Sequence, residues 1–121
     1  MQEFWTVTVF DKMELPDGLD KESYSNLMIA EVNEGFLHKH FGDIWTCGVF
    51  ENEEDAVHVV ENNVTDIQET CYGYAIVEKY TAGLYPFMRD FKLYKWDGKQ
   101  FVRCTDSPLF HVGFQGFTFQ R

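Results

Sequence analysis

The sequence predicts an α+β fold, with a mainly antiparallel sheet of five to six strands and one principal helix (about 52–63) packed on one face. Three observations support this fold class. Several short segments alternate apolar and polar residues with the period of a strand, one stretch has the capping residues and apolar stripe of a helix, and an Asp-Gly pair joins two strand-like segments. At 121 residues the chain suits a single domain, 1–121.

Strand signals dominate the first part of the chain. Residues 4–10 alternate in the manner of a half-buried strand, and residues 27–32 and 45–50 also have the composition of strands. Between the first two of these segments, residues 11–26 are rich in charge and contain a Pro-Asp-Gly turn sequence. We therefore expect residues 11–26 to form an acidic surface loop.

The principal helix is predicted directly after residues 45–50. Asn52 is a favoured N-cap residue, and the three acidic residues that follow it place negative charge in the first turn, where the helix dipole favours it. The apolar residues of the segment recur on one stripe: Ala56, Val57, Val60 and Val64. This pattern predicts an amphipathic helix with its apolar face on the sheet.

The second part of the chain is again strand-rich. Residues 74–80 are apolar on both faces until Glu78, which is typical of a central strand. Residues 91–96 and 99–104 flank Asp97-Gly98, a strong hairpin signal, and residues 114–119 supply a last strand.

A two-residue turn at Asp97-Gly98 would fix the hairpin register. It would put Leu93 opposite Val102, and Phe91 opposite Cys104, on the side facing the core. The other side would then carry three pairs: Trp96 with Lys99, Tyr94 with Phe101, and Lys92 with Arg103.

Aromatic rings flanked by cations suit a stacked base and its phosphate. The expected binding residues of such an anion site are Lys92, Tyr94, Trp96, Lys99, Phe101 and Arg103, joined by Arg89 from the preceding loop. A like-charge pair of Lys92 and Arg103 would cost about 0.2 to 1 kcal/mol, which an anion would relieve. The alternative is that these cations pair with carboxylates of the same chain and that the rings are core.

The charge is divided along the chain, whose formal net charge is −10. Residues 1–69 contain six Asp and ten Glu against three Lys, whereas the remainder is mildly basic. This favours a protein-binding module whose acidic half engages a basic protein surface, such as that of a nucleic-acid-binding or defence protein. The expected partner-facing residues are Glu14, Asp17, Asp20 and Glu22. Direct binding to long nucleic acid is disfavoured by the net charge.

Motifs for catalysis and metal binding are missing from the sequence, which favours a binding protein over an enzyme. His38 and His40 form the closest histidine pair but lack a third ligand at a readable spacing, so we expect no metal and no cofactor. Cys71 is the best candidate for a nucleophile, and the three cysteines do not suggest a disulfide framework. There is no membrane-spanning run or signal peptide, so we expect a cytoplasmic protein.

Several motifs in order along the chain resemble a family of small, functionally uncharacterised bacterial and phage-related proteins. The segments that carry the resemblance read CGVF at 47–50, VENN at 60–63, YGYAIVEK at 72–79, GLYP at 83–86 and YKW at 94–96. They are similar to the family pattern "VGYF…A…V..N..DI.E..Y.YAVIEK…GLYP…YKW", over residues 45–119 of this chain. The resemblance implies no known activity and suggests a phage or mobile-element accessory protein with a counter-defence role. A third reading, a housekeeping domain with a merely solvated charged surface, also stays open.

Overall fold

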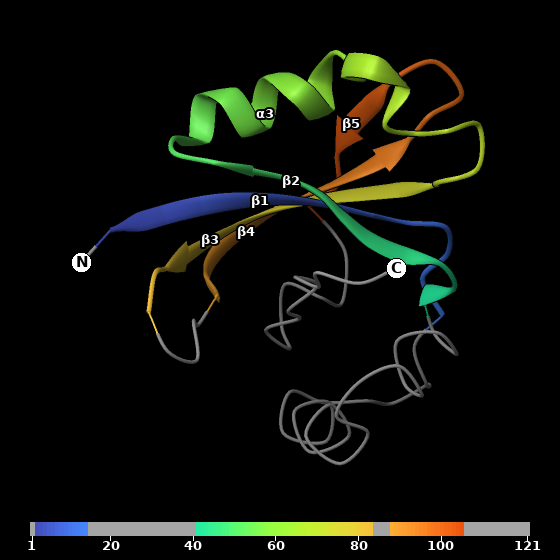
Figure 1. Cartoon of the computed structure of the whole chain (residues 1–121). Helices are drawn as coiled ribbons and strands as arrows, with labels where there is room; N and C mark the ends of the chain where they lie inside the picture. Colours follow the sequence, from blue (N-terminus) through green and yellow to red (C-terminus); the bar gives the residue numbers. More distant parts are fainter. Residues whose placement is uncertain (1, 15–40, 84–87, 106–121) are drawn as a thin grey trace.

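The computed structural model describes residues 2–14, 41–83 and 90–105 in full. Of Met88 and Arg89 it describes the backbone only. These residues form a five-stranded antiparallel sheet in the order β2-β1-β3-β4-β5 and one α-helix (Figure 1). The elements are β1 (Glu3–Phe10), β2 (Ile44–Phe50), α3 (Glu53–Glu61), the 3₁₀ turn η1 (Val64–Asp66), β3 (Tyr74–Thr81), β4 (Met88–Trp96) and β5 (Phe101–Arg103). The predicted α+β fold with an antiparallel sheet is confirmed. The strands expected at 27–32 and 114–119 lie outside the described residues.

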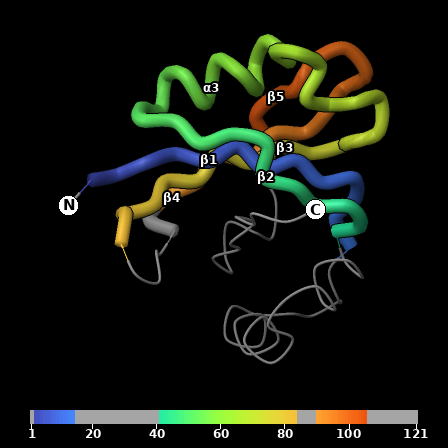
Figure 2. The backbone as a smooth tube through the Cα atoms, in the orientation of Figure 1, coloured from blue at the N-terminus to red at the C-terminus, as the bar shows by residue number. Residues whose placement is uncertain are grey.

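The core on the α3 side is a single cluster of small and aromatic side chains. Strand residues alternate between the two faces of a sheet, so the odd-numbered valines of β1 meet the odd-numbered residues of β3. Ala56 and Val60 of α3 are fully buried in the same cluster. The sheet side of the cluster consists of Val7, Val9, Ala75, Val77, Tyr94 and Phe101. Figures 1 and 2 show α3 running above the strands on this side.

A β-bulge at Cys47 adapts the edge strand β2 to this core. Val7 pairs with Gly48 and Thr8 with Thr46, so Cys47 is the extra residue. Because the bulge interrupts the alternation, Trp45, Cys47 and Phe50 can all pack against the cluster. A Cβ at Gly48 would lie 2.7 Å from the Phe50 ring, so a larger residue there would force that ring to move.

The register of the β4–β5 hairpin differs from the prediction. Tyr94 pairs with Arg103 and Trp96 with Phe101, and the Cys104 N–H donates to the Leu93 carbonyl. All five predicted pairs are therefore wrong: Trp96–Lys99, Tyr94–Phe101, Lys92–Arg103, Leu93–Val102 and Phe91–Cys104. The cause is Asp97, whose Oδ1 accepts hydrogen bonds from the N–H groups of Lys99 (2.8 Å) and Gln100 (2.9 Å). These bonds favour a four-residue turn over the two-residue turn that Asp-Gly usually forms.

The shift amounts to two residues, so the same side chains still share a face. The prediction that the Tyr94 face is open is wrong, however, because this face packs against the cluster beneath α3. Tyr94, Trp96, Phe101 and Arg103 still share one face, because they occupy directly paired positions. Leu93 is fully buried on the other face, as predicted. Val102 was expected to be buried and is instead 38% exposed.

Helix α3 begins as predicted. The Oδ1 atom of Asn52 accepts a hydrogen bond from the Asp55 N–H at 2.9 Å, and this is an N-cap contact. The helix ends at Glu61, two residues before the predicted end, because Asn63 adopts a left-handed conformation with φ of 45°. Among the described elements, α3 is the only α-helix, and its nine residues are too few to cross a membrane.

We expect Asn52→Ala to lower the free energy of unfolding by about 0.5 to 2 kcal/mol, because the Asp55 N–H loses its acceptor. The measurement is urea-induced unfolding followed by circular dichroism. His58→Ala, on the exposed side of α3, is the control and should change the free energy by no more than about 0.5 kcal/mol. Equal small effects of both substitutions would contradict the cap.

The turn carboxylate should make stability depend on pH. Hydrogen bonds from the backbone N–H groups of Gln100 and Lys99 hold the pKa of Asp97 below its usual value of 3.8. A lowered pKa in the folded state stabilises the fold above the unfolded-state pKa, and this contribution is lost as the pH falls through the folded-state value. Below about pH 4, wild type should therefore lose stability faster than Asp97→Asn in urea unfolding. Parallel pH profiles of the two proteins would refute this role of Asp97.

Candidate functional site

Two of the predicted binding residues are part of the core. Tyr94 is 1% exposed and Phe101 is 3% exposed, and both belong to the cluster that contains Ala56 and Val60 of α3. Trp96 is half-buried, and its ring meets that of Phe101 edge-on at 5.0 Å between centroids. The central part of the predicted aromatic face is therefore occupied by protein, and only its rim is accessible.

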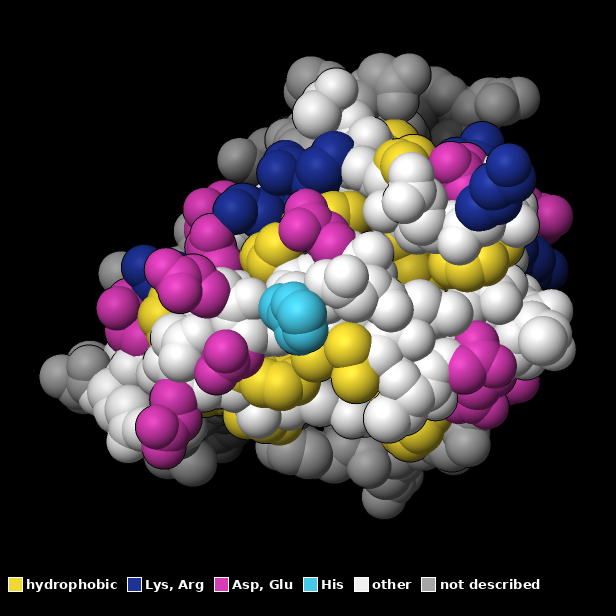
Figure 3. Space-filling view, turned by 90° about the horizontal axis from the view of Figure 1, so that it is seen from above, with side chains coloured by type: hydrophobic (Ala, Val, Ile, Leu, Met, Phe, Trp, Pro, Cys, Tyr) yellow, Lys and Arg dark blue, Asp and Glu magenta, His cyan; other side chains and the backbone are white. Residues whose placement is uncertain are grey.

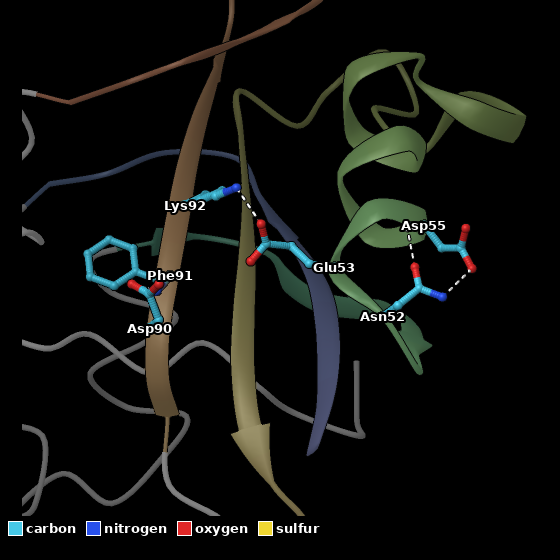
Figure 4. A network of polar contacts seen from close by, with 6 residues as sticks. All are labelled: Asn52, Glu53, Asp55, Asp90, Phe91 and Lys92. Atoms are coloured by element: carbon cyan, nitrogen blue, oxygen red, sulfur yellow. Dashed lines mark hydrogen bonds and ion pairs between the residues drawn. The ribbon is translucent and has the colours of Figure 1, made fainter. Parts of the chain in front are cut away.

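Lys92 is paired within the chain. Its Nζ lies 2.5 Å from Oε1 of Glu53, at the start of α3 (Figure 4). Glu53 belongs to the acidic half of the sequence. For Lys92, the structure therefore shows the alternative in which a hairpin cation pairs with a carboxylate of the same chain. This ion pair also links β4 to the first turn of the helix.

The surface around this ion pair is a shallow depression with no enclosed volume, lined by Glu53, Val77, Lys79, Asp90, Phe91 and Lys92. Its second cation is also engaged. Lys79 contacts Glu3 at 3.0 Å and lies over the ring of Trp5 at 5.8 Å from the centroid. The charges that line the depression therefore sum to zero, and both of its cations are in ion pairs.

Arg103 is exposed, and its guanidinium carbon lies 5.6 Å from the centroid of the Tyr94 ring. Burial raises the pKa of Tyr94 above its ordinary value; the Glu61 carboxylate adds to this shift, and Arg103 opposes it. Tyr94 is consequently a neutral phenol at physiological pH. Lys99 is exposed in the Asp97 turn, and the side chain of Arg89 lies outside the described residues.

The predicted acidic residues are described only in part. Glu14 is exposed and lies 3.5 Å from Lys12. Asp17, Asp20 and Glu22, together with His38 and His40, lie outside the described residues. Cys71 is exposed in the segment that leads into β3.

The structure exposes a different set of carboxylates, on α3 and its flanking turns. We name Glu51, Glu54, Asp55, Glu61 and Asp66 the α3 acidic surface; all five are exposed. Figure 3 looks down on this side of the molecule, where Asp and Glu side chains are spread over the surface and the Lys and Arg side chains lie in the upper half of the view, beside further carboxylates. The sequence contains the signal for it, because no Lys or Arg occurs between Lys39 and Lys79.

A carboxylate on the opposite face of the sheet was not singled out from the sequence. Glu78 of β3 is fully buried, directly opposite Thr6 of β1, which is fully buried as well. Thr8, the next residue of β1 on this face, shares a hydrogen bond with Thr46 at 2.8 Å. This face therefore combines apolar packing with a polar centre. The apolar residues around Glu78 in the sequence gave no reason to expect a functional group there.

Comparisons with protein-family models, with curated proteins and with solved structures gave no match to this chain.

Because Tyr94 fills the core beneath α3, Tyr94→Ala should lower the free energy of unfolding by about 3 to 5 kcal/mol, through lost burial and the cavity it leaves. Lys99→Ala, in the exposed turn, should change it by no more than about 0.5 kcal/mol. Both values can be obtained from urea unfolding. A cost below about 1 kcal/mol for Tyr94→Ala would mean that this side chain is not a core residue.

Proposed function

We propose that the chain is a non-enzymatic protein-binding module whose α3 acidic surface engages a basic surface of a partner protein. The observation that carries the proposal is the concentration of exposed carboxylates on α3 and its flanking turns. From residue 41 to residue 78 the sequence contains nine Asp and Glu and no Lys or Arg. Of these nine, Glu53 is paired with Lys92 and Glu78 is buried. The other seven are exposed, and five of them form the α3 acidic surface.

Glu61 supports a role for the surface beyond solubility. It is the last residue of α3, where the helix dipole disfavours a negative charge by about 0.3 to 1 kcal/mol. The first-turn carboxylates Glu54 and Asp55 stabilise the helix, but Glu61 does not. Residues that oppose local stability are often kept for function, and here the placement extends the acidic surface along the full length of α3.

The partner class that fits is a protein with a basic surface, and we propose a nucleic-acid-binding or defence protein, as an accessory protein of a phage or mobile element would engage. Such proteins carry clustered Lys and Arg for their own ligands. Complementary charge would speed association and select against acidic partners.

The sequestration of a small nucleotide by the whole hairpin face is the weaker proposal, because Tyr94 and Phe101 are buried and Lys92 is paired. A housekeeping domain would use neither surface. These alternatives differ from the main proposal in their response to charge reversal on α3.

The test reverses Glu51, Glu54 and Glu61 to Lys. The changes in α3 have opposite effects on the helix dipole, so the fold should be retained. Proteins captured from the host lysate by wild type and not by the variant are identified by mass spectrometry, and their binding to purified protein is then measured. The association rate should fall by at least about tenfold between about 50 and about 500 mM salt, as exposed charges become screened.

The matched control is the double variant Lys12→Gln with Lys95→Gln, in which two cations are replaced instead. This variant should bind the purified partner as wild type does. Association that is insensitive to salt, or equal binding by the charge-reversed variant, would overturn the proposal. Circular dichroism of each variant confirms that the comparison is between folded proteins.

A further inference from the structure

The described cations fall into two groups. Three are in ion pairs with carboxylates: Lys12 with Glu14, Lys79 with Glu3 and Lys92 with Glu53. The other three, Lys95, Lys99 and Arg103, are exposed and have no ion pair within the described part of the chain. All three of this second group lie on the β4–β5 hairpin.

This grouping is unexpected for a chain with twenty Asp and Glu against ten Lys and Arg. If the hairpin cations served only to balance charge, the abundant carboxylates would be expected beside them. The one carboxylate within residues 95–103 belongs to Asp97, and its Oδ1 accepts hydrogen bonds from two backbone N–H groups of the turn. Within the described part of the chain, no carboxylate forms an ion pair with these three cations.

An aromatic ring lies among these cations. Trp96 pairs with Phe101, and Arg103 pairs with Tyr94, so Trp96 and Arg103 are diagonal neighbours on one face of the hairpin. Such neighbours are about 7 to 8 Å apart, within reach of long side chains. Arg103 rests over the Tyr94 ring, and Phe101 supports the half-buried Trp96 from the core. Lys99 lies in the turn that joins Trp96 to Phe101, whereas Lys95, which pairs with Val102, lies on the opposite face of the hairpin.

We propose that this hairpin tip, consisting of Trp96, Lys99 and Arg103, binds a nucleotide unit. The base would stack on the exposed part of the indole, and the phosphate would be held by the cations. The ligand is either a free nucleotide or a short single strand, which share this chemistry. Long duplexes are disfavoured by the net charge of −10. The site shares no residue with the α3 acidic surface, so either proposal can fail alone.

The test is a titration of the ¹⁵N-labelled full chain, followed by the indole N–H signals of Trp5, Trp45 and Trp96, each assigned by a Trp→Phe substitution. The probes are deoxyadenosine 5′-monophosphate and a single strand of about eight deoxyadenosines. The Trp96 signal and the backbone signals of Lys99 to Phe101 should shift, while the Trp45 signal should not. If the strand binds more tightly than the mononucleotide, the ligand is a short single strand. If the two bind with equal affinity per nucleotide, the ligand is the free nucleotide.

Lys99→Gln with Arg103→Gln should weaken binding at least about fivefold, because two phosphate contacts are lost. Lys12→Gln, which removes an exposed cation outside the hairpin, should have no effect. The unchanged remainder of each spectrum shows that the variant is folded. The proposal is overturned if Trp96 does not respond, if the double variant binds as wild type does, or if inorganic phosphate at the same concentration produces the full response.

Discussion

The burial of β3 on both faces is the constraint on which the rest of this structure depends. β3 pairs with β1 on one side and β4 on the other, and it contributes Ala75 and Val77 to the cluster beneath α3. Ile76 and Glu78 are fully buried on the other face. Without this strand the helix would lack an apolar surface to cover, and the β4–β5 hairpin would lose its anchor, the Trp96 N–H bonded to the Gly73 carbonyl at 2.8 Å.

Acidic and basic side chains lie in different places around β3. Carboxylates on α3 face solvent, and the pair of Glu53 with Lys92 lies between helix and sheet. Unpaired cations are found at the hairpin tip, so the described part of the molecule is polarised, with acid along the helix and base at the end of the sheet. Both proposed sites follow from this separation, and the hairpin tip is joined to the core through Trp96, which packs against the cluster.

Local signals predicted much of this structure. The N-cap of α3, the central position of β3 and the shared face of Tyr94, Trp96 and Arg103 all follow from residue type and period, which act over a few residues. The predicted hairpin register was wrong because the Asp97 carboxylate accepts hydrogen bonds from the turn backbone and favours a longer turn. The Asp-Gly signal does not show which of the two turns will form. The bulge at Cys47 and the burial of Tyr94 beneath α3 depend on tertiary packing, which no local pattern encodes. The prediction that these residues share one face was therefore correct, and the prediction that the aromatic surface is open was wrong.

The edges of the sheet have a consequence for how the protein meets other molecules. The Cys47 bulge breaks the regular spacing of β2, β5 has only three residues, and the Phe91 N–H of β4 donates to the Asp90 carboxylate at 2.8 Å. Each feature makes the backbone a poorer template for an added strand. Fibril growth by lateral strand stacking is thereby opposed even where the flanking residues are apolar. The contacts proposed above are accordingly made by side chains. Their charge can be altered by substitution without disturbing the strands beneath.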